Sequence, residues 1–123
     1  MDANAVAKQF SEFYYNVFDT DRSQLSGLYR DSSMMTWEGQ PFMGTANIVE
    51  KLTNLPFEKV QHKVTTVDAQ PSGTGLLVFF TGLLAVDGNA EQPLQFSQTF
   101  QLQQNENQTG FWVSNDIFRL NYG

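Results

Sequence analysis

The chain has 123 residues and a net charge of −6, and 41% of its residues are hydrophobic. This length and this apolar content predict a single domain, residues 1–123, with a packed core. The acidic balance offers no basic stripe to a phosphate backbone, so we expect no nucleic-acid partner; the absence of cysteine excludes disulfides, thiol catalysis and zinc–thiolate sites.

A membrane partner is not expected either, because no apolar run reaches the ~20 residues of a membrane span. The N-terminal residues have neither the basic start nor the apolar stretch of a signal peptide. We therefore expect the cytosol as the default location, with access to the nucleus. The negative charge suits a basic protein partner, since surface charge steers association. An equally weighted alternative to a basic partner is that the negative charge only keeps the small protein soluble.

The first half of the chain has helical periodicity. Apolar residues from Val6 to Phe18 recur at helical spacing and predict a long N-terminal helix with one broad apolar stripe. Residues 19–21 end that helix and can cap a short second one. The elements expected next are a short strand at residues 33–37, a turn at residues 39–41, and a third helix from about residue 44 to Pro56.

The second half has the composition of long strands. They are expected at residues 57–69, 76–86, 94–103 and 111–122, with turn residues between them. All four prolines fall between the expected elements. Helices followed by strands predict an α+β fold with helices packed on one face of an antiparallel sheet.

The last two expected strands have faces that differ from an ordinary solvent face. In the strand at residues 94–103, one face is apolar and the other holds only uncharged Gln, Ser and Thr. In the final strand, one face carries Asp116 and Phe118, and the other carries Val113, Ile117 and Arg119. Such surfaces favour a sheet-to-sheet homodimer over a glutamine-rich face exposed to solvent.

His62, the only histidine, is expected to point inward, because it shares a strand face with Val60 and Val64. Asp68 is expected on the same face, and Asp116 is the best acid from another strand. A general base working with such an acid is one interpretation, and a packed histidine in a core or pocket wall is the commoner one. A single histidine and the lack of a glycine-rich phosphate loop predict no metal site and no cofactor.

Trp37-Glu38-Gly39 places an aromatic side chain and a carboxylate at the end of the short strand. The alternative is a core tryptophan beside a solvated glutamate. Leu55-Pro56-Phe57 adds apolar residues at a helix-to-strand corner, and Asp87 and Glu91 add acids in a turn. An apolar hole ringed by carboxylates suits an aromatic side chain of a partner, flanked by lysine or arginine.

These residues belong to longer strings that form a specific pattern. The strings are Phe18-Asp19-Thr20-Asp21-Arg22 with Leu25, Met35-Thr36-Trp37-Glu38-Gly39, Ile48-Val49-Glu50-Lys51-Leu52, Leu55-Pro56-Phe57 with Gln61-His62, Asp68-Ala69-Gln70-Pro71, Phe96-Ser97-Gln98, and Asn115-Asp116-Ile117-Phe118-Arg119-Leu120. Over almost its whole length, the chain resembles the nuclear transport factor two family. Enzymes of the same architecture, such as dehydratases and isomerases, do not share these strings.

The resemblance implies a cone-like fold, in which a curved antiparallel sheet wraps a long N-terminal helix and leaves a hydrophobic cavity. It implies a non-enzymatic nuclear transport factor, a homodimer found in the cytoplasm, the nucleus and at nuclear pores. The implied partners are the GTPase Ran in its GDP form and the phenylalanine-glycine repeats of nucleoporins.

The resemblance also implies a site for each partner. The Ran-binding rim is Glu38, His62, Asp87 and Glu91, with Asn89 as the alternative to Glu91. The Ran-binding cavity is lined by Trp37, Leu55, Phe57, Val60, Leu84 and Phe118. Asp19 lies in the repeat-binding groove, and Ile117 lies in the dimer interface.

One position departs from the family pattern. The repeat-binding groove commonly has an aromatic residue where this chain has Ala3. Repeat binding is therefore expected to be weaker or to use other aromatic side chains. The competing hypothesis for the whole chain is a small-molecule dehydratase or isomerase of the same fold that uses His62 in the cavity.

Overall fold

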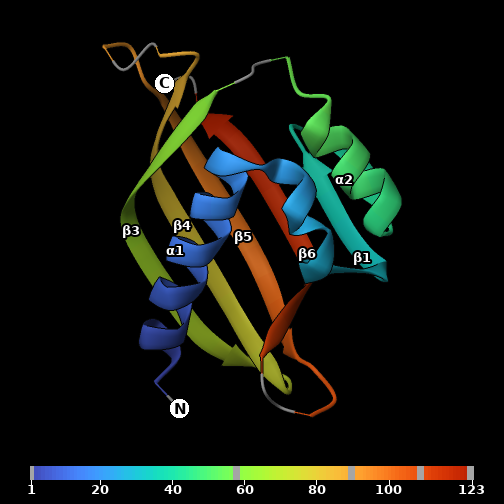
Figure 1. The fold of residues 1–123 in the computed structure, drawn as a ribbon. Coiled ribbons are helices and arrows are strands. Elements are labelled where there is room, and N and C mark those ends of the chain that lie inside the picture. The colour runs from blue at the N-terminus through green and yellow to red at the C-terminus, as the bar shows by residue number, and fades with distance from the viewer. Residues whose placement is uncertain (1, 57–58, 89–90, 108–109, 122–123) are drawn as a thin grey trace.

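The computed structural model describes residues 2–56, 59–88, 91–107 and 110–121. It confirms the expected α+β fold, with a curved sheet that wraps the long first helix (Figure 1). The elements in chain order are α1 (Ala3–Thr20), the 3-10 helix η1 (Arg22–Leu28), β1 (Tyr29–Trp37), β2 (Gln40–Met43), α2 (Thr45–Thr53), β3 (Val60–Ser72), β4 (Gly75–Val86), β5 (Leu94–Gln104) and β6 (Phe111–Asn121).

The six strands form one sheet in the order β2-β1-β6-β5-β4-β3. β1 pairs with β6 in parallel, and the other neighbouring strands pair antiparallel. A wholly antiparallel sheet was expected. The parallel pair forms because β6, the last strand of the chain, lies beside β1, the first strand, and runs in the same direction. β3 and β2 are the edges of the sheet.

Strand β2 was expected to be part of a turn. Glu38 and Gly39 both have positive φ, at 50° and 86°, and they turn the chain so that β2 pairs back on β1. The expectation that all prolines lie between elements is wrong for Pro41 in β2 and Pro71 in β3. Both strands are edges, where the missing N–H of proline removes no bond to a further strand.

Helix α1 packs its apolar stripe on the inner face of the sheet. The Asp2 carboxylate caps the helix by accepting from the N–H groups of Asn4 and Ala5, at 3.1 and 3.3 Å. Phe10 and Tyr14 are buried, and their rings lie 5.0 and 4.8 Å from that of Phe100 in β5. Burial of each such ring stabilises the fold by about 1.5–3 kcal/mol.

A bulge in β6 changes which side chains face the core. Gln101 pairs with Asn115 and Leu102 with Val113, so Ser114 is the extra residue. Val113 is therefore buried on the inner face with Asp116 and Phe118. The expectation that Val113 shares the outer face with Ile117 is wrong.

A second bulge lies in β3. Val64 pairs with Gly82 and Thr66 with Thr81, which leaves Thr65 as the extra residue. Gly82 is required there, because a Cβ at that position would collide with the carbonyl oxygen of Lys63. The bulge inverts the alternation beyond it, so Asp68 is exposed and does not share the inward face of His62, as had been expected.

Candidate functional site

Trp37 and Glu38 lie where β1 ends against β6. The Trp37 ring stacks on the ring of Phe118, its partner in the strand pair, with centroids 4.0 Å apart. The Glu38 N–H donates to the carbonyl of Phe118 at 3.1 Å, and the Glu38 carboxylate accepts from the N–H of Leu120. The strand end therefore holds the half-buried Glu38 carboxylate in a fixed position.

The residues predicted to line a cavity are packed together in the core. Those described are all buried: Trp37, Leu55, Val60, Leu84 and Phe118. Phe57 lies outside the described residues. Leu55 also opens onto a surface hollow of about 700 Å³, whose other lining residues are Arg22, Thr53, Pro56, Lys59, Asp87 and Gly88. The structure thus places Leu55 and Asp87 at one hollow, and Trp37 and Phe118 do not line it.

Asp87 has its carboxylate fixed beside this hollow. Its φ is 51°, and its carboxylate accepts from the N–H of Lys59 at 3.0 Å, while its own N–H donates to the Lys59 carbonyl at 2.7 Å. Glu91 is exposed in the connection between β4 and β5, and Asn89 lies outside the described residues. Asp87 is therefore an acid anchored by the backbone where β4 ends beside the start of β3.

Two cations line the same hollow, and sequence reasoning did not include them. Arg22 places its guanidinium carbon 5.7 Å from the centroid of the Phe18 ring. Burial lowers the pKa of Arg22, and the charges of Asp87 and Asp19 act in the opposite direction. Lys59 is the second cation. The sequence carries no signal for either role, because only the tertiary structure brings Arg22 of η1 and Lys59, which precedes β3, to the same hollow as Asp87.

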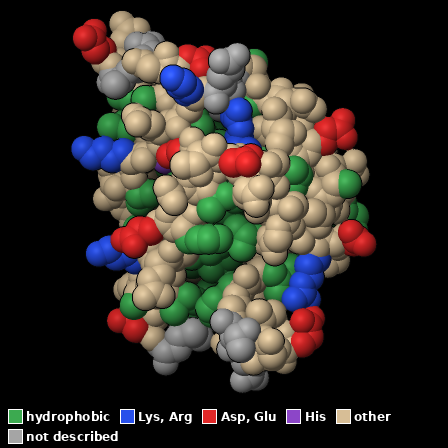
Figure 2. Space-filling model, viewed as in Figure 1, with side chains coloured by type: hydrophobic (Ala, Val, Ile, Leu, Met, Phe, Trp, Pro, Cys, Tyr) green, Lys and Arg blue, Asp and Glu red, His purple; other side chains and the backbone are tan. Residues whose placement is uncertain are grey.

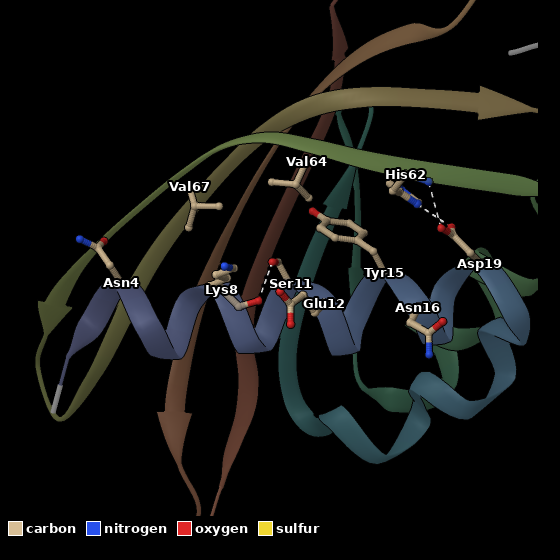
Figure 3. A pocket seen from close by; sticks show the side chains of 10 residues that line it. All are labelled: Asn4, Lys8, Ser11, Glu12, Tyr15, Asn16, Asp19, His62, Val64 and Val67. Carbon is tan, nitrogen blue, oxygen red and sulfur yellow. Dashed lines mark hydrogen bonds and ion pairs between the residues drawn. The ribbon is translucent and has the colours of Figure 1, made fainter.

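His62 of β3 and Asp19 of α1 form a polar contact between the two elements (Figure 3). Asp19 Oδ2 accepts from the His62 backbone N–H at 2.9 Å, and Oδ1 lies 2.7 Å from the ring Nδ1. The His62 side chain is 1% exposed, and its ring stacks on Tyr15 with centroids 4.4 Å apart. Both residues line a hollow of about 720 Å³ between α1 and β3.

The inward orientation of His62 is confirmed, but its acidic partner is neither Asp68 nor Asp116. The contact unites two residues that the resemblance assigned to different partners, Asp19 to the repeat groove and His62 to the Ran rim. Sequence reasoning missed the pair because the residues are 43 positions apart and no local pattern links them.

Asp116 belongs to a buried polar network. Its carboxylate accepts from the Tyr29 hydroxyl and from the Gln98 amide, both at 2.8 Å. Tyr29 shares a hydrogen bond of 2.7 Å with Tyr14, and the Tyr15 hydroxyl donates to Gln98 at 2.8 Å. Burial raises the pKa of Asp116 to about 6, although the bonds from Gln98 and Tyr29 oppose the rise.

The outer face of the sheet carries exposed apolar side chains. Ile117 is 52% exposed and is paired with Thr36 on one side and Thr99 on the other. The other large apolar residues exposed on these strands are Met34, Met43, Leu77 and Phe79. The β5 residues between them are uncharged and half-buried: Ser97, Thr99 and Gln101.

The described residues include no group of three or more His, Asp or Glu side chains that could hold a metal ion. Among the helices in the described part of the chain, none is long and apolar enough to cross a membrane.

Comparison with known proteins places this geometry in a family. The sequence profile of the nuclear transport factor 2 (NTF2) domain matches residues 6–120. This chain belongs to the nuclear transport factor 2 family. It is 53% identical to nuclear transport factor 2 of Davidiella tassiana, covering 98% of this chain and 96% of the relative. It is 54% identical to nuclear transport factor 2 of Oryza sativa subsp. japonica, covering 100% of both.

Solved structures extend the comparison to the fold. Nuclear transport factor 2 from Cryptosporidium parvum has a TM-score of 0.89 and 46% identity, covering 98% of this chain and 99% of that chain. A putative dehydratase from Streptomyces avermitilis has a TM-score of 0.82 at 13% identity, which shows the shared fold alone. The relatives that are about half identical support a nuclear transport factor without enzymatic activity, as the sequence predicted.

Proposed function

We propose that this chain imports Ran into the nucleus, by binding Ran in its GDP form and the phenylalanine-glycine repeats of nucleoporins. The observation that carries the Ran site is the anchoring of two acids by backbone N–H donors. Leu120 holds Glu38, and Lys59 holds Asp87. Because the Leu120 donor is uncharged, the Glu38 carboxylate keeps its negative charge for a basic partner. The charge of Asp87 also acts on Arg22, which lines the same hollow.

The hollow beside Asp87 supplies the apolar part of the proposed Ran site. Leu55 and Pro56 line it. An aromatic side chain of Ran entering there would bury apolar area against them, while its basic neighbours pair with Asp87 and Glu38. Glu91, with Asn89 as its alternative, is the proposed further polar contact with Ran. The net charge of −6 favours encounter with a basic surface.

His62 and the buried residues predicted to line the cavity would contribute to the proposed Ran site from the core. His62 pairs with Leu84 across β3 and β4, and its ring packs against those of Phe18 and Phe96 at 4.9 and 5.2 Å. It would therefore position Leu84 and the aromatic rings around it rather than contact Ran with an exposed ring.

The outer face of the sheet supports a homodimer. Ile117 is exposed there beside Thr99 and Thr36, and none of these side chains is charged. The part of this face around Ile117 can be covered by a second copy without burying an unpaired charge, provided that Arg119 on the same face keeps contact with solvent or with an acid. Helix α1 lies on the other face of the sheet, so both copies would keep their partner sites open (Figure 1).

The lack of cysteine in the chain allows a direct test of the Ran site. Pro56→Cys, labelled with an environment-sensitive dye, reports on the hollow beside Asp87. Thr74→Cys, in the turn between β3 and β4, reports on the opposite end of the sheet and serves as the control. Ran loaded with GDP should change the emission at position 56 and not at position 74. An unchanged emission at position 56, under conditions where Ran-GDP binds the protein, would place the site elsewhere.

A further inference from the structure

Arg119 is the only charged residue that strands β4, β5 and β6 place on the outer face of the sheet. β4 and β5 contain no charged residue. β6 contains two, Asp116, which is buried on the inner face, and Arg119, which is exposed. The face that carries the helices, in contrast, displays acidic and basic side chains at many points (Figure 2). A single cation on the proposed dimer surface is therefore a distinct feature of the outer face.

Arg119 lies between the proposed dimer surface and the turn that carries Glu38. It shares the outer face with Ile117, two residues earlier on β6. Its guanidinium Nη2 lies 3.3 Å from the position that a Cβ would take at Gly39. Because Gly39 has no side chain, the guanidinium can rest directly on the turn between β1 and β2.

The backbone on each side of Arg119 holds Glu38. The Phe118 carbonyl accepts from the Glu38 N–H at 3.1 Å, and the Leu120 N–H donates to the Glu38 carboxylate. Glu38 has a φ of 50°, a conformation that is uncommon for a residue other than glycine. A residue keeps such a conformation only where its surroundings impose it. The presentation of the Glu38 carboxylate therefore depends on the contacts that this part of β6 makes with the turn.

The side chain of Arg119 is weakly restrained in the single chain. It is exposed and makes no hydrogen bond or ion pair with another described residue. A long side chain of this kind exchanges among many rotamers, so the guanidinium covers the turn for only part of the time. A second copy packed on Ile117 would cover the aliphatic stem of Arg119 and leave the guanidinium at the edge of the interface, over the turn.

We propose that Arg119 is a positioning residue that couples dimer formation to Ran binding. A second copy on the outer face holds the guanidinium on Gly39, and this contact preorganises Glu38 for a basic group of Ran. The inference rests on the Ran site and the dimer proposed above. Dimer formation orders the turn in advance, so Ran binding does not bear that cost. Coupling between two sites is reciprocal, and Ran-GDP therefore also tightens the dimer.

The charge of Arg119 alone predicts an effect of the opposite sign. A cation beside an acidic rim repels a basic partner, so its removal would strengthen Ran binding if charge were its whole contribution. If Arg119 positions Glu38, its removal weakens Ran binding. The direction of the change in affinity of Arg119→Gln therefore separates the two roles.

The experiment measures the affinity for Ran-GDP per subunit, by titration calorimetry, in the wild type, Arg119→Gln, Ile117→Glu and the double variant. Each single variant should bind about 5- to 10-fold more weakly, and the double variant should lose no more than either, because both changes remove the same coupling. Light scattering should find Arg119→Gln dimeric, and circular dichroism verifies that each variant is folded. Lys63→Gln is the matched control, because Lys63 is an exposed cation of the outer face on β3, away from the turn. It should bind as the wild type does.

The reciprocal measurement is the dissociation constant of the dimer with and without Ran-GDP, by sedimentation of dye-labelled protein. Since each copy carries one Ran site, saturating Ran-GDP should lower the constant of the wild type by the square of the coupling, about 25- to 100-fold. The constant of Arg119→Gln should not change. A side chain that only stabilised the fold would not produce this dependence on Ran.

The outcomes separate this inference from the proposed function. Equal or tighter binding of Ran-GDP by Arg119→Gln, relative to the wild type, would overturn the positioning role and leave the Ran site intact. Equal binding by the wild type and a monomeric Ile117→Glu would do the same. A dimeric Ile117→Glu would overturn the interface on which the coupling depends. A wild type that does not bind Ran-GDP would overturn the proposed function itself.

Discussion

The carboxylate of Asp19 contacts His62 twice, at the backbone N–H and at the ring Nδ1, at 2.9 and 2.7 Å. This pair joins the end of α1 to the first residues of β3, and it fixes the ring of His62 between the aromatic side chains of Tyr15 and Phe18. Residues assigned by resemblance to two separate partners thus form one structural unit.

Asp19→Ala should therefore destabilise the protein and weaken both proposed binding activities. The buried backbone N–H and ring nitrogen of His62 lose their acceptor, which costs about 1–3 kcal/mol. Urea denaturation measures the free energy of unfolding, and the two binding assays measure the partners. Asp68→Ala is the control, because Asp68 is exposed on the same strand and should change stability by less than about 0.5 kcal/mol. Equal stability of the two variants would contradict the role of the pair.

Asp116 should make stability fall as the pH rises through the range from about 4 to 6. Its folded-state pKa is raised to about 6 from an unfolded value of 3.8. The carboxyl is protonated in both states below that range, whereas within it the unfolded chain releases the proton first. The lost stability is about 3 kcal/mol at pH 7.

Asp116→Asn tests this effect, because it keeps an oxygen for Gln98 and removes the charge. The free energy of unfolding of the variant, relative to the wild type, should increase by about 3 kcal/mol between pH 4 and pH 7. The free energy of unfolding of Asp68→Asn, a change at an exposed site, should vary with pH as that of the wild type does. If the free energy of Asp116→Asn also varied as that of the wild type does, Asp116 would ionise normally.

Ile117→Glu should convert the proposed dimer into a monomer, because it places an unpaired charge in an apolar interface. Light scattering measures the mass, and circular dichroism should remain native-like because the side chain is exposed in the single subunit. Phe13→Glu is the matched control: Phe13 is 55% exposed against 52% for Ile117, but it lies on α1 on the other side of the sheet. A dimeric Ile117→Glu, or a monomeric Phe13→Glu, would contradict the proposed interface.

Glu38→Gln should weaken Ran-GDP binding roughly tenfold at low salt, since one partly buried charge pair is lost. Glutamine keeps an oxygen that accepts from the Leu120 N–H, so stability should be little changed. Glu38→Lys is less suitable, because it removes that acceptor as well as reversing the charge. Glu50→Gln, an exposed acid on α2, should bind Ran normally. The same loss in both variants would indicate a general charge effect and no specific rim.

The elements with strong periodicity could be predicted from the sequence, including α1, the four long strands and the inward His62. The predictions that were wrong concern features that depend on pairing between distant segments. The bulge at Thr65 exists because Gly82 lets the carbonyl of Lys63 approach, and it turned Asp68 outward. Strand β2 depends on the positive φ of Glu38, a residue for which such a conformation is uncommon.

The candidate site could likewise be predicted from the sequence only in part. The string Trp37-Glu38 marked the end of β1 correctly, but the sequence could not show that Leu120 would hold the Glu38 carboxylate. Gln98 was noted only as part of the string Phe96-Ser97-Gln98, and the fold is what brings its amide to Asp116. Hydrogen bonds between side chains from different strands leave no periodic signal, so they require the tertiary structure.

The nucleotide dependence of Ran binding tests the central claim most directly. Titration calorimetry should be carried out with wild-type protein against Ran loaded with GDP and against Ran loaded with a non-hydrolysable GTP analogue. The proposed function predicts saturable binding to the GDP form and little or none to the GTP form. Equal affinity for the two forms, or no binding to either, would contradict it.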